Sequence, residues 1–222
     1  MATKYVHPIS KECGFIPSID ISKIQLPVDI SQTVGSTLYL NESLPGLIKG
    51  EPTALLLDVN NLYKRAQANG FKIDYARLLS VFKNRCDVRY SAAYSAIDPD
   101  NTHTESWIKY MTNTGFEVIT KDLKRYTDHT GSLITKGNMD VEITMGALDL
   151  DSGFGHIVIG SCDGDFVALL DRLREGKLRK VSVLGMSNED GTGMSRSLID
   201  AADHFYDLSG IKDFIKDRRH NE

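Results

Sequence analysis

From residue 53 onward, short apolar runs alternate with stretches whose apolar residues recur at helical spacing. This alternation limits the fold more than any other feature of the chain. The first run is TALLLDV at residues 53–59, and the last is HFYDL at residues 204–208. Strands that alternate with helices in this way form a parallel sheet with helices on both faces. We therefore predict an α/β domain of three layers around a central, mainly parallel sheet.

The positions of the individual elements follow from the same pattern. The predicted strands cover residues 53–59, 88–97, 116–120, 156–161, 180–186 and 204–208. The predicted helices cover residues 61–70, 74–85, 104–115, 139–150, 165–176 and 195–203. Residues 121–137 are polar and rich in turn residues, so we expect a hairpin or a loop there.

The first 50 residues differ from the rest of the chain. They carry 4 basic and 4 acidic residues, so the remaining 22 basic and 26 acidic residues account for the whole net charge of −4. Pro and Gly signals separate short runs that could form strands. We predict an N-terminal extension at residues 1–50, with short β elements, and a single domain at residues 51–222. Such an extension suggests regulation or assembly into a homo-oligomer.

The cellular setting is constrained by what the chain lacks. No apolar run approaches the roughly 20 residues that span a bilayer, so we expect no membrane partner. Cys13, Cys86 and Cys162 include no CxxC pair, which argues against a cysteine zinc site and fits a reducing, cytoplasmic setting. The chain also has no P-loop, no GxGxxG after a strand and no DxDx[TV] after the first strand, which disfavours a dinucleotide enzyme or a phosphatase.

Four aspartates fall where predicted strands end or a helix begins. Asp58 ends the first run, Asp163 and Asp165 follow the strand at 156–161, and Asp140 opens a helix after turn residues. The carboxyl ends of parallel strands meet at one edge of the sheet, where ligands bind. Carboxylates gathered there repel one another unless a cation is present, and Mg²⁺ or Mn²⁺ prefers such oxygen ligands.

Each of these acids also has a simpler interpretation. Asp165 could cap the helix that follows it, and Asp58 could cap the helix at 61–70, with Asn60 or Asn61 sharing that role. Asp140 could be a first-turn acid that the helix dipole favours.

Four strings carry a resemblance to a known family. LLLDVNNLYKRA, TKGNMDVEITMGALDL, VIGSCDGDFVALLDRLREGK and SRSLIDAADHFYDL resemble the NYN family of PIN-like ribonuclease domains, which includes the DUF88 group. The resemblance spans residues 53–208 and keeps the order of all four blocks. It implies a PIN-like, Rossmannoid fold, a divalent metal held by aspartates, and endonucleolytic cleavage of RNA phosphodiester bonds.

The resemblance assigns roles by matching residues. Metal-binding and catalytic roles are implied for Asp58, Asp140, Asp163 and Asp165. Substrate-binding roles are implied for Asn61, Lys136 and Ser161. Two positions depart from the family pattern. Gly146 stands where members often carry a further acid, with Asp149 the nearest substitute, and Cys162 replaces a glycine. Gly146 keeps open an alternative, a catalytically degenerate module that binds RNA or regulates.

Residues 121–136 combine basic side chains with an aromatic one. Lys124 and Arg125 lie beside Tyr126 in this segment, which suits the binding of single-stranded or structured RNA. A solvated connecting loop explains the same composition equally well. The aromatic and apolar residues Trp107, Tyr110 and Met111 are expected in the core or an interface.

Overall fold

A computed structural model describes residues 44–127, 131, 133–175, 179–187 and 192–215. Residues 1–43 lie outside this part of the chain, so the β elements expected in the extension stay a prediction, as does the domain boundary near residue 51. Among the described residues, no helix combines the length and the apolar character that crossing a bilayer requires.

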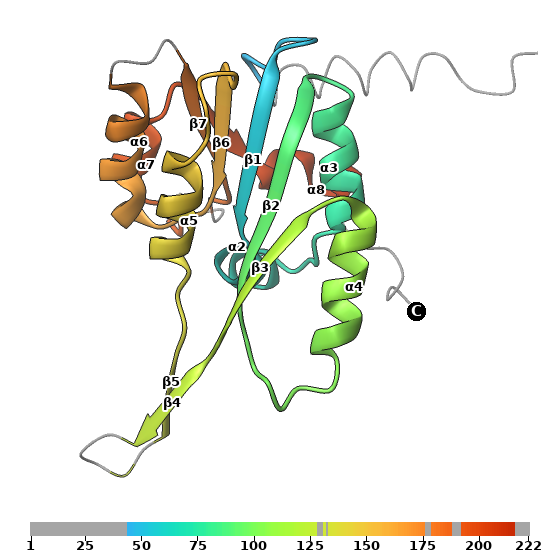
Figure 1. Cartoon of the computed structure of the whole chain (residues 1–222), viewed down its shortest axis with the longest axis vertical. Helices are drawn as coiled ribbons and strands as arrows, with labels where there is room; N and C mark the ends of the chain where they lie inside the picture. The colour runs from blue at the N-terminus through green and yellow to red at the C-terminus, as the bar shows by residue number, and fades with distance from the viewer. Residues whose placement is uncertain (1–43, 128–130, 132, 176–178, 188–191, 216–222) are drawn as a thin grey trace, which may run out of the picture. The chain divides into compact units, whose positions relative to one another are not determined.

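Six parallel strands form the central sheet, as predicted (Figure 1). The sheet order is β3-β2-β1-β6-β7-β8. The strands are β1 (Pro52–Asp58), β2 (Asp87–Ile97), β3 (Glu117–Asp122), β6 (His156–Gly160), β7 (Lys180–Gly185) and β8 (Phe205–Asp207). The chain first adds strands on one side of β1 and then on the other, so the order reverses between β1 and β6. Such a reversal opens a crevice at the carboxyl ends of the two strands.

Helices cover both faces of this sheet (Figure 1). One layer holds α2 (Val59–Ala68), α3 (Tyr75–Lys83), α4 (Thr104–Thr114) and α8 (Lys212–Ile215), and the other holds α5 (Asp140–Leu148), α6 (Val167–Arg174) and α7 (Arg196–Ala201). Side chains of β1 alternate between the layers, because successive strand residues point to opposite faces. Leu55 and Leu57 belong to the first core, and Ala54 and Leu56 belong to the second.

Two short segments complete the domain. Residues 121–137, predicted as a hairpin or a loop, contain an antiparallel hairpin of β4 (Lys124–Thr127) and β5 (Leu133–Lys136). The hairpin continues β3 beyond the sheet and returns to the start of α5 (Figure 1). A 3-10 turn, η3 (Leu208–Ile211), leads into α8 after the last strand. The sequence pattern did not predict this C-terminal turn and helix.

Candidate metal and nucleic-acid site

Asp58 is buried at the end of β1, where the strand order reverses, with only 7% of its surface exposed. Its Oδ1 accepts a hydrogen bond from the backbone N–H of Asn61 at 3.1 Å, so Asp58 caps α2. Asn60 does not share this capping, because its side-chain amide pairs with the backbone of Ala96 in β2. The Asn61 side chain instead accepts from the N–H of Cys162 at 3.0 Å. These bonds join the ends of β1, β2 and β6.

The segment after β6 carries Ser161, which contacts Asp58, and then Asp163 and Asp165. The Ser161 hydroxyl donates to Asp58 Oδ2 at 3.4 Å and accepts from the N–H of Asp163 at 3.2 Å. Asp163 Oδ1 accepts from the N–H of Asp165 at 3.1 Å, so Asp163 caps the 3-10 turn η2 (Gly164–Phe166). The prediction that Asp165 could cap the following helix is wrong, because η2 precedes α6 and Phe166 occupies its N-cap.

Asp140 begins α5, and a close backbone approach puts it there. A Cβ atom on Gly137 would lie 2.4 Å from Leu123 Cδ2 and 2.6 Å from Ala96 Cβ. Only glycine therefore lets the chain pass over the end of β2 without displacing its neighbours. The Asn138 side-chain amide then donates to Asp140 Oδ2 at 2.7 Å and orients the carboxylate.

Three of the four predicted acids come together. Asp140, Asp163 and Asp165, called the acidic cluster below, each offer a carboxylate oxygen, and these oxygens lie within 4.8 Å of one another. Burial, followed by the charges of Asp163 and Asp165, raises the pKa of Asp140. Asp58 lies outside this group, although the charges of Asp140 and Asp163 reach it. Burial is the main cause that raises the pKa of Asp58 to about 6.

The donor set of the acidic cluster fits a hard divalent cation. All of its ligand atoms are carboxylate oxygens, which Mg²⁺ and Mn²⁺ prefer. A cation would also offset the repulsion by Asp163 and Asp165, which adds to burial in raising the pKa of Asp140.

The two departures from the family pattern have different structural consequences. A Cβ atom on Gly146 would lie 2.1 Å from the Tyr94 hydroxyl, so that hydroxyl fills the space that an acid at this position would need. Asp149 does not replace the acid, because it is exposed at the C-cap of α5 and outside the acidic cluster. Cys162 is buried, and its sulfur accepts from the N–H of Met186 at 3.3 Å. It is a packing residue that leaves the acids in place.

The basic residues predicted to bind substrate lie on the hairpin. Lys124 and Arg125 are exposed on β4, and Lys136 ends β5, although its side chain lies outside what the structure describes. The Arg125 guanidinium pairs with Asp98 and, at 2.7 Å, with Asp100 in the loop before α4. Arg125 therefore attaches the hairpin to that loop, and Lys124 is the exposed cation beside it.

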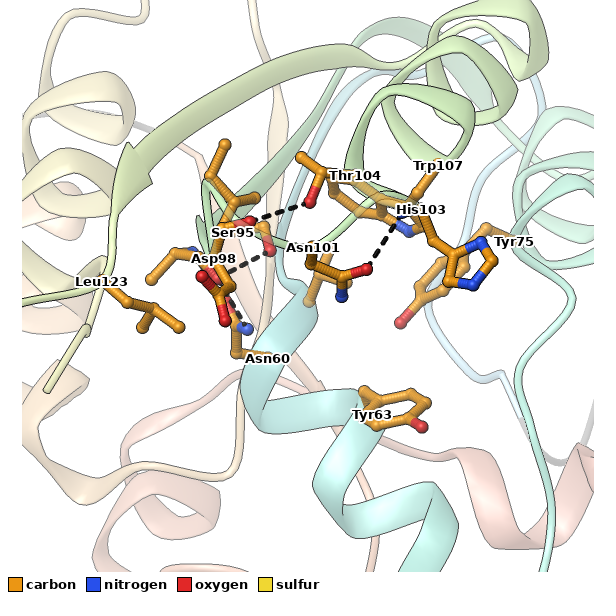
Figure 2. A pocket seen from close by; sticks show the side chains of 13 residues that line it. Asn60, Tyr63, Tyr75, Ser95, Asp98, Asn101, His103, Thr104, Trp107 and Leu123 are labelled. Carbon is orange, nitrogen blue, oxygen red and sulfur yellow. Dashed lines mark hydrogen bonds between the residues drawn. The ribbon is translucent and has the colours of Figure 1, made fainter. Parts of the chain in front are cut away.

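A pocket at this edge of the sheet was missed by the sequence analysis (Figure 2). It has a volume of about 440 Å³ and is lined by residues from α2, α3, α4, the end of β2, the loop between β2 and α4, and by Leu123, which follows β3. Trp107 packs partly against the core, as predicted, but it also lines this pocket. The only sequence signal is Tyr75, which places a hydroxyl on the buried face of α3.

Comparison with known proteins gives consistent results across the domain. The family model described as NYN domain matches residues 52–209. A protein from Synechococcus elongatus, described as low amplitude and bright protein LabA, is 30% identical over 168 residues, which cover 73% of this chain and 87% of that protein. The crystal structure of a protein of unknown function from Vibrio parahaemolyticus matches with a TM-score of 0.60 and 29% identity, and covers 74% of this chain and 96% of that one.

Proposed function

This chain belongs to the NYN domain family, and on that premise we propose that it is a divalent-metal-dependent endoribonuclease. The observation that carries the proposal is the acidic cluster, whose carboxylate oxygens lie within 4.8 Å of one another. The cluster lies beside the β1–β6 crevice, where a doubly wound sheet binds its ligand. NYN domains belong to the PIN-like nuclease superfamily and are generally associated with RNA, so RNA is the expected substrate.

In this proposal the acids and Ser161 have different roles in metal binding and catalysis. Asp140, Asp163 and Asp165 hold Mg²⁺ or Mn²⁺, which when bound would activate water and stabilise charge on a phosphate. Asp58 is a further acid outside the acidic cluster. Ser161 connects it to Asp163 through two hydrogen bonds. Ser161 thereby holds the backbone at Asp163, and the N–H of Asp165 holds the Asp163 carboxylate. An acid that is fixed before substrate arrives reduces the reorganisation that the reaction requires.

The remaining predicted residues would bind the RNA or position the segments beside it. Lys124 is exposed on the hairpin, and with Lys136 it would attract the phosphate backbone. Arg125 would act mainly by keeping the hairpin beside the site, because two aspartates already pair with it. Asn61 would position the loop after β6, since its side chain bonds the N–H of Cys162.

Cleavage of labelled single-stranded and hairpin RNA, with Mg²⁺, Mn²⁺ or EDTA, tests the proposal. The native chain should cut RNA only with metal, and Asp163→Asn should slow cleavage by a factor on the order of a hundred or more. Asn can still cap η2, so this variant should fold. Asp171→Asn, an exposed acid on α6, is the matched control and should cut normally. Equal cleavage in EDTA or by Asp163→Asn would contradict the metal site.

One observation favours the alternative, a family member that binds RNA without cutting it. The Tyr94 hydroxyl fills the space beside Gly146, so the chain carries no acid at that position. Metal-independent binding of RNA, with no cleavage under any of the metal conditions, would select this alternative over the nuclease.

A further inference from the structure

The pocket introduced above lies on the β2 side of Asp58, whereas Asp163 and Asp165 lie on the β6 side. Val59 and Asn60, which directly follow Asp58, form part of its wall, and Figure 2 shows Asn60 there. The pocket and the acidic cluster therefore flank the same strand end. A volume of about 440 Å³ falls within the range of ligand pockets and accommodates a single nucleotide-sized group.

An unpartnered buried hydroxyl points into this pocket. Tyr75 is 6% exposed, and among the described residues its hydroxyl has no hydrogen-bond partner. Figure 2 shows the hydroxyl directed toward the space between Asn101 and Tyr63. Buried hydroxyls almost always have a partner, so this one is placed for a ligand. Burial and the nearby charge of Asp58 raise the pKa of Tyr75, so the hydroxyl keeps its proton and can donate it.

The pocket walls suit a flat aromatic ligand. Tyr63 is 44% exposed on α2, and Trp107 lies across from it on α4 (Figure 2). Nucleobases in single-stranded RNA stack on such side chains. The one acid in the lining, Asp98, is paired with Arg125, so its charge is partly offset and repels a phosphate less.

We propose that this pocket receives one unstacked nucleobase of an RNA strand whose backbone passes the acidic cluster. The Tyr75 hydroxyl bonds an edge of the base, and Tyr63 and Trp107 contact its faces. The identity of the strand as RNA rests on the proposed function. A base that is paired in a duplex cannot enter, so the pocket selects single-stranded or looped RNA.

The chain supplies its own reporter for this binding. Trp107 is the only tryptophan among the 222 residues, so intrinsic tryptophan fluorescence reports directly on the pocket. The full chain in EDTA is titrated with ribonucleoside 5′-monophosphates and a short single-stranded RNA, with ribose 5-phosphate as the base-free control. We expect saturable quenching by the ligands that carry a base and none by ribose 5-phosphate. Absence of quenching by nucleotides and RNA, or equal quenching by ribose 5-phosphate, would overturn the proposal.

Because EDTA removes the metal, the outcome is independent of cleavage. Quenching by a chain that never cuts RNA would support the pocket and contradict the nuclease. Cleavage without quenching would contradict the pocket and leave the nuclease intact. A duplex of the same sequence should quench more weakly than the single strand, and equal quenching would overturn the selection for unpaired bases.

Two variants test the named contacts. Tyr75→Phe should weaken binding roughly two- to tenfold, because it removes one hydrogen bond to the base. Tyr63→Ala should weaken it by about fivefold or more through lost stacking, and its exposed position makes a folding defect a minor concern. Tyr206→Phe is the matched control, since Tyr206 is buried in β8 and does not line the pocket. Native affinity in both Tyr75→Phe and Tyr63→Ala would rule out this mode of binding.

Discussion

At the scale of single residues, two acids of the candidate site also hold local structure. Asp58 caps α2, and Asp163 caps η2, each through one carboxylate oxygen. The second oxygen of Asp58 receives the Ser161 hydroxyl. A capping aspartate has its carboxylate fixed by the backbone, so the site gains rigid acids without additional supporting side chains.

Burial of Asp58 should cost the protein stability near neutral pH. Its folded-state pKa of about 6 exceeds the ordinary value of 3.8, so its contribution to stability is full below pH 3.8 and is lost as the pH rises through 6. Asp58→Asn should therefore raise the free energy of unfolding by roughly 1–3 kcal/mol at pH 8 in EDTA, and by little at pH 4. Urea denaturation at both pH values measures this.

The control for this prediction is Asp171→Asn, an exposed acid on α6, which should leave the free energy of unfolding unchanged. If Asp58→Asn were destabilising at pH 8, the carboxylate would be favourably held in the folded protein, contrary to the burial described above.

The tight space between Gly146 and Tyr94 predicts that substitutions of these two residues have non-additive effects on the free energy of unfolding. Gly146→Ala should destabilise the native chain by about 1–3 kcal/mol, because the new Cβ would lie 2.1 Å from the Tyr94 hydroxyl. In a Tyr94→Phe background the nearest ring carbon is still 3.2 Å away, a tight contact, and the higher helix propensity of alanine offsets part of its cost. Gly146→Ala should therefore destabilise this background much less than the native chain. Thermal denaturation of the four proteins measures the coupling. Additive effects would show that the hydroxyl does not restrict this position.

At the scale of elements, the hairpin of β4 and β5 forms a separate two-stranded sheet beyond the central one (Figure 1). Every β4 residue is exposed. The pairing of Arg125 with Asp98 and Asp100 attaches the hairpin to the loop before α4. At its base, the ion pair of Lys121 with Glu142 at 2.8 Å joins β3 to α5, the two elements that flank the hairpin. Ion pairs at an exposed position set the orientation of an element more than the stability of the whole fold.

Loss of the first attachment should loosen the hairpin. Arg125→Ala should speed amide hydrogen exchange in β4, measured by mass spectrometry, while the core strands keep native exchange. Arg172→Ala is the matched control, because Arg172 pairs with Glu175 within one segment of chain and joins no two elements. Unchanged exchange in β4 would show that the ion pair does not hold the hairpin.

Most strands and helices of the domain could be predicted from the sequence because each has its own apolar periodicity. All six strands of the sheet lie where short apolar runs predicted them, and Asp140 and Asp163 were correctly expected at the same edge. Other features depend on tertiary contacts. The 3-10 turn before α6, which gives the cap to Asp163 rather than Asp165, has no period of its own. The pocket draws its lining from separate segments, and no local pattern brings these together.

At the scale of the whole molecule, a buried histidine makes stability depend on pH. His156 begins β6 and is fully buried, and its Nε2 lies 2.8 Å from the Ser182 hydroxyl. Glu51 is 3.8 Å from its Nδ1 but only 2.7 Å from Lys180, so the closer ion pair of that carboxylate is with the lysine. Burial, aided by the charge of Lys180, lowers the pKa of His156 to about 3.

Acid should therefore destabilise the fold through His156. Its folded-state pKa lies below the ordinary 6.5, so its contribution is full above pH 6.5 and is lost as the pH falls toward 3. Asp58 changes stability in the opposite direction between pH 3.8 and 6. The effect of His156 is therefore measured as the difference between the native chain and a His156 variant, in which the contribution of Asp58 cancels. The native free energy of unfolding relative to His156→Gln should fall by roughly 1.4 kcal/mol per pH unit between pH 6 and 4. Denaturant titrations at several pH values measure both free energies. If the two changed with pH by the same amount, the buried histidine would not be neutral in the folded protein.

The reversal of strand order also sets when the site can exist during protein synthesis. Ser161 lies 103 positions after the Asp58 that it contacts, and the whole acidic cluster follows β1, β2 and β3 in the chain. A ribosome that has made only these three strands has released Asp58 without any member of the cluster. For the proposed ribonuclease, a nascent chain thus stays inactive toward its own messenger RNA until the later strands are made.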